Sequence, residues 1–247
     1  MLIPGSRQTW QIMALLDDVL EANGGLAHWN NLKQFTLHLS VAGTLFSPLG
    51  SVGNFKDLTT EGSTRTQSVR FTGLMAGEKT GSFQPDLVTI ERPDGQVMRT
   101  WTNPGLLYSD PASNPLSDEL HLVFLCGFSI WNYLTTPFLL SRPDVHVEEL
   151  VPWRENTHLW RRLRAIFPPD IVTHSSEQIF YFDESGLQRR TDHDLMGISV
   201  AHHSWAHQVF CGIMVPTLRR SSILRPDGTV VPKPALVEVE IFDATFA

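Results

Sequence analysis

The last third of the chain carries a dense group of side chains that could do chemistry: Asp192, His193, Asp194, His202, His203 and His207. Imidazole and carboxylate groups bind metal ions and transfer protons near neutral pH. On a helix, His203 and His207 would share a face and could chelate one ion. On a strand they lie about 13 Å apart, so a metal would need ligands from neighbouring strands. We therefore expect acid–base chemistry here and no metal site.

The sequence around this group alternates between apolar and polar residues, which is typical of β-strands. Two such strands, 187–194 and 199–210, flank a turn at Met196–Gly197 and predict a hairpin. Neighbouring residues on a strand point to opposite faces, so the register of this hairpin decides which side chains meet.

A short loop would place Arg190 opposite or diagonal to His203, and Asp192 beside Ala201 in the same way. The more apolar face of the second strand is assigned to a ligand cavity, and it carries Ala201, His203, Trp205, His207 and Val209. In that cavity His203 would be the acid or base, and Asp192 would orient it. Arg190 would stabilise an anion, Trp205 would shape the substrate, and His207 would belong to the same catalytic set.

Other familiar catalytic patterns do not occur in the sequence. It contains no Gly-x-Ser-x-Gly motif, and its two cysteines, Cys126 and Cys211, do not lie in a motif that would activate a thiolate. No Gly-x-Gly-x-x-Gly or Walker-type loop occurs, so we expect no nucleotide and no other cofactor. The formal net charge of -7 offers no basic footprint, and we expect no nucleic-acid partner.

Alternation with a period of two predicts two runs of antiparallel strands separated by a helix. The first run contains strands at 34–46, 52–60, 64–72, 78–83 and 87–92. The second contains strands at 145–150, 158–167, 177–182, 187–194, 199–210, 214–223 and 236–241. We interpret residues 1–247 as a single mostly β (α+β) domain, with a curved antiparallel sheet of about ten strands.

Two helices are predicted beside this sheet. Residues 7–22 place apolar side chains on one helical face and end at Asn23–Gly25, and a short helical turn follows through Leu26–Trp29. A second helix begins at Ser117 or Asp118 and is apolar around much of its circumference. Such a helix fits against the concave side of a curved sheet and would plug an unclosed half-barrel.

Three segments of the sequence resemble the lipoprotein-localisation fold, the LolA/LolB-like superfamily: Gly24–Trp29, Trp131–Phe138 and Phe180–Arg190. The resemblance covers nearly the whole chain and points to a cytoplasmic bacterial branch of these proteins. It implies an unclosed antiparallel barrel plugged by helices around an apolar cavity. Exported members carry a signal peptide, whereas this sequence passes directly into the helix at 7–22, which predicts a cytoplasmic protein.

We expect the protein to bind a hydrophobic or amphipathic small molecule in the concave cavity. Aromatic residues would line the cavity and two polar anchors would stand at its wall: Phe124, Phe128, Trp131 and Trp205, with Tyr181 and Arg161 as the anchors. One function is a cofactor-independent isomerase, cyclase or lyase of specialised metabolism that uses His and Asp. The alternative is a non-catalytic carrier of a lipid or other apolar ligand, and a partner-binding protein is a third class.

The most apolar run of the sequence, residues 120–140, is interrupted by polar residues and by Pro137. Because of these interruptions it falls short of a continuous apolar span, so no membrane span is expected. The sequence does not determine the oligomeric state.

Overall fold

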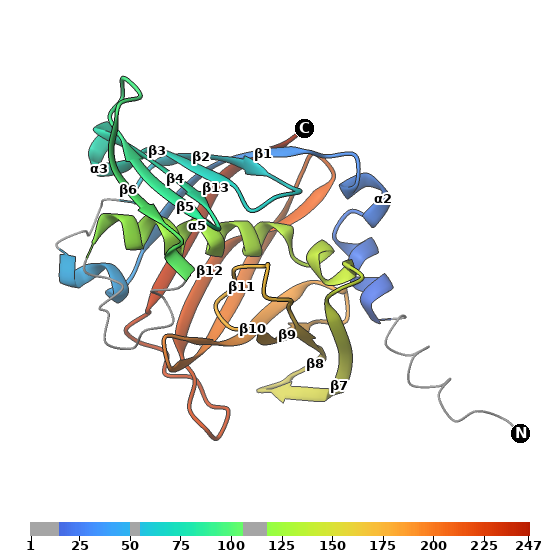
Figure 1. Ribbon diagram of the computed structural model, residues 1–247. Helices are drawn as coiled ribbons and strands as arrows, with labels where there is room; N and C mark the ends of the chain where they lie inside the picture. Colours follow the sequence, from blue (N-terminus) through green and yellow to red (C-terminus); the bar gives the residue numbers. More distant parts are fainter. Residues whose placement is uncertain (1–14, 50–54, 106–117) are drawn as a thin grey trace, which may run out of the picture.

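A computed structural model of the protein describes residues 15–49, 55–105 and 118–247, and these residues form one curved antiparallel sheet of thirteen strands (Figure 1). The first six strands are β1 (Gln34–Ala42), β2 (Leu58–Ser63), β3 (Val69–Gly73), β4 (Lys79–Gln84), β5 (Leu87–Glu91) and β6 (Val97–Thr102). The other seven are β7 (His146–Glu155), β8 (His158–Ile166), β9 (Glu177–Phe182), β10 (Gln188–Leu195), β11 (Ile198–Phe210), β12 (Ile213–Ile223) and β13 (Val237–Phe246). The predicted mostly β half-barrel is confirmed, with thirteen strands instead of about ten.

The sheet consists of two antiparallel meanders, β1 to β6 and β7 to β13, which lie side by side. Each of β1 to β6 pairs with the next strand in sequence, and so does each of β7 to β13. The first and last strands then pair with each other, with Phe35 opposite Phe246 and Val41 opposite Val239. Their alternating side chains are buried on one face of the sheet, as a period of two requires. The two edges of the sheet are therefore β6 and β7.

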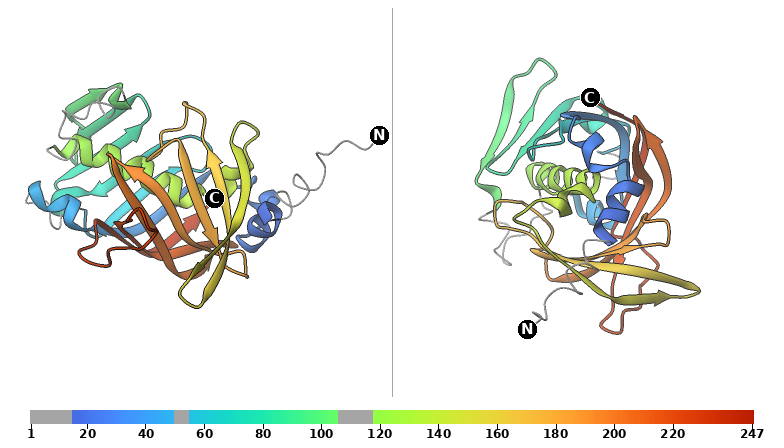
Figure 2. Two further views of the ribbon diagram at one scale, coloured as in Figure 1. Left: turned by 90° about the horizontal axis from the view of Figure 1, so that it is seen from below. Right: turned by 90° about the vertical axis from the view of Figure 1, so that its right-hand side faces the viewer.

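Helix α5 (Glu119–Thr135) lies in the chain between these two edge strands, and it runs along the concave side of the sheet. Its 17 residues are about 25 Å long. The right-hand panel of Figure 2 shows the strands curving around this helix. Asp118, one of the two caps that the sequence allows, caps its first turn by accepting a hydrogen bond from the backbone N–H of Leu120 at 2.8 Å. The helix is buried almost all round because the sheet surrounds it.

Small residues let α5 approach the sheet closely. A Cβ atom on Gly127 would lie 2.4 Å from Cβ and Cγ of Phe83 on β4. On the same strand, a Cβ on Gly81 would lie 2.7 Å from the Val123 side chain of the helix. These distances are too short for real contacts, so glycine at both positions sets the distance between helix and sheet.

The N-terminal part of the described chain closes one end of the half-barrel. Residues 15–22 are helical, as predicted, while 7–14 lie outside the described residues. The predicted second turn is α2 (Leu26–Trp29), and Trp29 stacks on Phe138 with ring centroids 4.4 Å apart. Phe138 begins a 3-10 helix, η2 (Phe138–Ser141), directly after α5. Two further short helices are η1 (Thr44–Leu49) and α3 (Leu74–Gly77).

The strands differ in several places from those expected from sequence. The strands predicted at 52–60 and 64–72 are the shorter β2 and β3, which begin at Leu58 and Val69, and the one predicted at 236–241 continues to Phe246 as β13. The first strand ends at Ala42 because η1 replaces its predicted end. The turn at Pro93–Gly95 leads into a strand that was not predicted, β6, which pairs with β5. Strand β7 continues to Glu155 instead of ending at residue 150. It passes through Pro152 because this edge strand is irregular there and needs no ladder hydrogen bond.

Candidate functional site

The predicted hairpin of β10 and β11 is confirmed in its register. Arg190 pairs with His203, and Asp192 pairs with Ala201. The turn at Met196–Gly197 has both residues at positive φ, which fits a tight hairpin connection. The side chains chosen from sequence for chemistry therefore do come together.

The face of the sheet on which they lie was wrongly assigned. His202 points to the concave side, where its ring stacks on Tyr133 of α5 with centroids 4.3 Å apart. His203, the next residue along the strand, points to the opposite, outer face. The set Ala201, His203, Trp205, His207 and Val209 therefore faces away from the helix. Hydrophobicity misled the assignment because Trp205 is 41% exposed, whereas His202 is 1% exposed.

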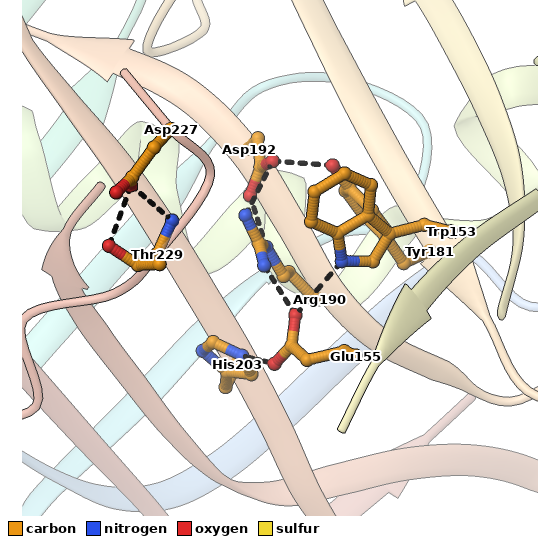
Figure 3. Close-up of polar contacts among 8 residues, drawn as sticks. All are labelled: Trp153, Glu155, Tyr181, Arg190, Asp192, His203, Asp227 and Thr229. Carbon is orange, nitrogen blue, oxygen red and sulfur yellow. Dashed lines mark hydrogen bonds and ion pairs between the residues drawn. The ribbon is translucent and has the colours of Figure 1, made fainter. Parts of the chain in front are cut away.

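Arg190 is the centre of a polar network on this outer face (Figure 3). Its side chain is only 1% exposed, and its Nε and Nη2 donate to the two oxygens of Asp192 at 2.6 and 2.9 Å. Its Nη1 donates to Oε2 of Glu155, near the Nε1 of Trp153. The hydroxyl of Tyr181 donates to Oδ2 of Asp192 at 2.6 Å. Each of the three guanidinium nitrogens thus donates a hydrogen bond to a carboxylate. The expected role of Arg190 as an anion stabiliser for a ligand is therefore not supported.

Glu155, which was not predicted to belong to the site, holds His203. Its Oε1 lies 3.0 Å from Nε2 of His203. Burial acts to raise the pKa of Glu155, but the hydrogen bond from His203 and the charge of Arg190 outweigh it and lower this pKa to about 2. Glu155 is therefore an ionised orienting group. Asp192 was expected to orient His203, but it accepts its hydrogen bonds from Arg190 and Tyr181. Glu155 contacts His203 instead.

These groups border an open cleft of about 1020 Å³ on the outer face. Glu155 and His203 lie in its wall, together with the aromatic rings of Trp160 and Trp205. His203 stacks on Trp205, with centroids 5.6 Å apart and planes 13° from parallel. A His–carboxylate pair beside two aromatic walls can orient a ligand and exchange a proton with it.

The remaining predicted site residues lie elsewhere. His207 is next to Arg189, whose Nη1 is 3.5 Å from its Nδ1, and burial followed by nearby arginine charge lowers its pKa to about 4. Arg161 pairs with Glu149 and Asp18 at the end of the half-barrel. Three of the predicted aromatic residues are core residues of α5: Phe124, Phe128 and Trp131. They cannot line an open cavity because the sheet packs against them; the Trp131 indole donates to the carbonyl of Ser63 at 2.8 Å.

The concave side holds a second polar group, in which His193 and His202 of the group named from sequence are joined by His174, which was not named. His193 and His202 on the sheet meet His174, and His174 and His193 have ring centroids 4.2 Å apart. The Nε2 of His174 is within 2.9 Å of the hydroxyl of Ser129 on α5. Burial lowers the pKa of His193 to about 3 and those of His174 and His202 well below the usual value. The three imidazoles are therefore neutral at pH 7.

Within the described ranges, no group of three or more His, Cys, Asp or Glu side chains has the arrangement of a metal site. In the same part of the chain, no helix has both the length and the apolar character required to cross a bilayer. Two voids between α5 and the sheet have volumes of about 20 and 10 Å³. The cleft of about 1020 Å³ lies on the outer face, not on the concave side where the ligand cavity was expected.

The sheet and its central helix define the class of protein: an unclosed antiparallel half-barrel wrapped around one apolar helix. The fold is LolA-like, as the resemblance in the sequence implied. It is similar to a LolA superfamily protein from Nitrosomonas europaea, with a TM-score of 0.50, 10% identity, and 94% of this chain and 92% of that chain covered. It is also similar to a protein domain named for outer membrane lipoprotein sorting, from Vibrio parahaemolyticus, with a TM-score of 0.52, 8% identity, and 96% and 92% covered.

No protein-family model matches the sequence, and no curated protein matches it. At identities of 10% or less, the two solved structures show the fold alone. The function has to be argued from the residues of this chain.

Proposed function

We propose that the protein binds an amphipathic small molecule in the cleft on the outer face of the sheet. The observation that carries this proposal is the combination of size and lining. A volume of about 1020 Å³ accommodates a drug-sized molecule, for which pockets of about 300–1,000 Å³ are typical. The wall combines the indole rings of Trp160 and Trp205 with the charged side chains of Arg189 and Arg220.

The charges in the wall favour a ligand with a polar but not strongly charged end. Arg189 pairs with Asp183 at 2.6 Å, and Arg220 pairs with Glu238 at 2.7 Å. Both cations are already compensated, so they can share hydrogen bonds with a polar group without requiring an anion. An apolar part of the ligand would lie on Trp205, which is 41% exposed.

A smaller cleft extends the same surface. It has a volume of about 300 Å³ and shares Trp205 and Arg220 with the larger one. Leu218, which is exposed on β12, also lines it. An elongated apolar chain can therefore continue past Trp205 along the outer face of the sheet.

An enzymatic role is the second candidate, and the contact between His203 and Glu155 favours it. The ionised carboxylate holds one ring nitrogen of His203 while the cleft gives a ligand access to the imidazole. This arrangement suits proton transfer in a cofactor-independent isomerase, cyclase or lyase, in which a base removes a proton and the same or another group returns it. Without turnover, the same cleft would serve a carrier.

Binding can be tested with the amphipathic fluorophore 1-anilinonaphthalene-8-sulfonate. We expect saturable fluorescence enhancement with the wild-type protein and a large loss of affinity in Trp205→Ala. Phe242→Ala is the matched control because Phe242 is similarly exposed on β13 but does not line either cleft. Equal binding by wild type and Trp205→Ala would contradict the proposal.

Mass spectrometry of compounds that copurify with the protein distinguishes an enzyme from a carrier. Native spectra followed by denaturing extraction would identify a bound molecule. If that molecule is converted by wild type and not by His203→Gln, the protein is an enzyme. If it is returned unchanged by both, the protein is a carrier.

A further inference from the structure

The imidazole of His203, in the wall of the outer cleft, is oriented from several sides. It stacks on Trp205 and meets the edge of Trp160, with ring centroids 5.6 and 6.5 Å apart and planes at 13° and 62°. Its Nε2 lies 3.0 Å from Oε1 of Glu155. The side chain is 14% exposed, so it is held by these contacts and still borders the cleft. The protein therefore sets the direction in which each ring nitrogen points.

The two oxygens of Glu155 meet different partners. Oε2 accepts from Nη1 of Arg190 and, at 3.4 Å, from Nε1 of Trp153, and neither of these groups can act as an acceptor. Oε1 contacts His203. Although burial acts to raise the pKa of Glu155, its contacts with His203 and Arg190 lower it to about 2, so this carboxylate carries no proton at neutral pH.

The contact with Glu155 decides which nitrogen of His203 carries the ring hydrogen. An ionised carboxylate only accepts hydrogen bonds, so the hydrogen between the two side chains belongs to Nε2. In a neutral imidazole the other nitrogen, Nδ1, is then an acceptor. Figure 3 shows this second nitrogen pointing away from Glu155. It forms no hydrogen bond with a described residue and is not enclosed by protein atoms, so a ligand in the cleft can reach it.

We propose that the outer cleft prefers ligands that donate a hydrogen bond, because His203 accepts it at Nδ1 while Glu155 holds the ring hydrogen on Nε2. The preferred group is an N–H or O–H attached to a planar apolar ring that lies against Trp205. This preference rests on the proposed function, binding of an amphipathic molecule in the cleft, and adds the functional group that the molecule presents. Glu155 is a positioning residue, since it acts through His203.

Isothermal titration calorimetry with three planar bicyclic probes tests the preference. Indole donates one N–H, quinoline accepts at its ring nitrogen, and 1-methylindole does neither. We expect the wild-type protein to bind indole at least about fivefold more tightly than either of the others, since one net hydrogen bond contributes about this factor. Equal affinity for the three probes, a preference for quinoline, or no saturable binding of indole would overturn the proposal.

The isosteric variant Glu155→Gln should reverse the preference. Its amide oxygen has to face the donors Arg190 and Trp153, so its amide nitrogen faces His203 and donates to Nε2. Nδ1 of His203 then carries the ring hydrogen, and quinoline should bind more tightly than indole. A preference for indole that is unchanged in folded Glu155→Gln would show that Glu155 does not control the acceptor.

NMR of protein with isotope-labelled histidine identifies the protonated ring nitrogen of His203 directly. We expect the hydrogen on Nε2 in wild type and on Nδ1 in Glu155→Gln, a change that a merely structural role of Glu155 would not produce. The same spectra give the pH range in which the ring is neutral, and the probes are compared in that range. A hydrogen on Nδ1 in wild type, or a ring that stays doubly protonated up to about pH 9, would overturn the assignment.

Two histidines on the outer face provide matched variants. His203→Phe keeps a ring against Trp205 but removes the acceptor, so the three probes should bind with similar affinity. His38 forms a similar pair outside both clefts: its Nε2 lies 3.1 Å from Oδ1 of Asp57, and its ring is next to Phe242. His38→Phe should leave the preference for indole unchanged. Loss of the preference in His38→Phe, or its retention in folded His203→Phe, would mean that another group is the acceptor.

Binding of 1-anilinonaphthalene-8-sulfonate to wild type and Trp205→Ala reports on the cleft independently of these probes. If the fluorophore binds and depends on Trp205 while indole is not preferred, the cleft is a binding site but His203 does not select donors. If the fluorophore binds equally well without Trp205, the proposed function and the preference both fail.

Discussion

His202 and His203 are neighbours in β11 but belong to different environments. His202 stacks on Tyr133 inside the half-barrel, whereas His203 contacts Glu155 at 3.0 Å on the outer face. The sheet thus separates a buried group of neutral imidazoles from an open cleft with an ionised carboxylate. The two histidines should respond differently to pH, ligands and substitution.

The interior histidines should make the protein sensitive to mild acid. The pKa of His193 is about 3 in the folded protein because the ring is buried, and the unfolded chain protonates near the usual value of 6.5. The unfolded state therefore binds more protons below about pH 6.5, and the free energy of unfolding falls by up to about 1.4 kcal/mol per pH unit for this residue. The nearby His174 and His202 act in the same direction.

The substitution His193→Phe removes one of these buried imidazoles, so the free energy of unfolding should depend less steeply on pH. Urea unfolding followed by circular dichroism from about pH 7 to about pH 5 measures the slope for both proteins. Glu155 loses its charge only near its pKa of about 2, so it contributes little to the folded-state titration in this range. Parallel pH profiles for wild type and variant would contradict the assignment of His193 as a buried neutral group.

Within the outer network, Asp192 should matter more for stability than Glu155. Asp192 accepts two hydrogen bonds from Arg190 and one from Tyr181, so Asp192→Asn should lower the free energy of unfolding by about 3 kcal/mol. Glu155→Gln leaves Arg190 paired with Asp192 and should cost about 1–2 kcal/mol. Chemical denaturation of both variants gives the order, and a larger loss in Glu155→Gln would show that the network is centred elsewhere.

The packing of α5 on β4 depends on Gly127. Helix propensity alone predicts that Gly127→Ala would stabilise the protein by about 1 kcal/mol. The added methyl would lie 2.4 Å from Phe83, so we expect a loss of about 1–3 kcal/mol instead. Thermal and urea unfolding distinguish the two signs, and a stabilised variant would mean that the helix can move away from the sheet at low cost.

The start of α5 should be sensitive to its cap. Asp118 accepts from the Leu120 backbone and also pairs with Arg99 on β6, with an Nη1 to Oδ1 distance of 2.9 Å. Asp118→Ala removes both contacts and should cost about 1–2 kcal/mol. Asp118→Asn retains a capping oxygen and separates the two effects. If both variants lose the same stability, the ion pair and not the cap is responsible.

Local patterns predicted the parts of the site that lie close together in sequence. The turn at Met196–Gly197 and the alternation of apolar and polar residues around it placed Arg190 opposite or diagonal to His203, and the start of the central helix was narrowed to Ser117 or Asp118. Glu155 was missed because Pro152 interrupts its strand. The alternation of Trp153 and Glu155 before the turn at residues 156–157 was the available signal.

The sequence by itself determined that adjacent histidines lie on opposite faces, because side chains on a strand alternate. Only the tertiary structure decided which face is inside. The chain from edge strand β6 to edge strand β7 includes α5, which runs along one side of the sheet, and that side becomes the interior whatever its polarity. This placement buries His202 and Arg219 and brings Glu155 to His203 across 48 residues of chain. Long-range contacts of this kind depend on the path of the whole chain and leave no local pattern.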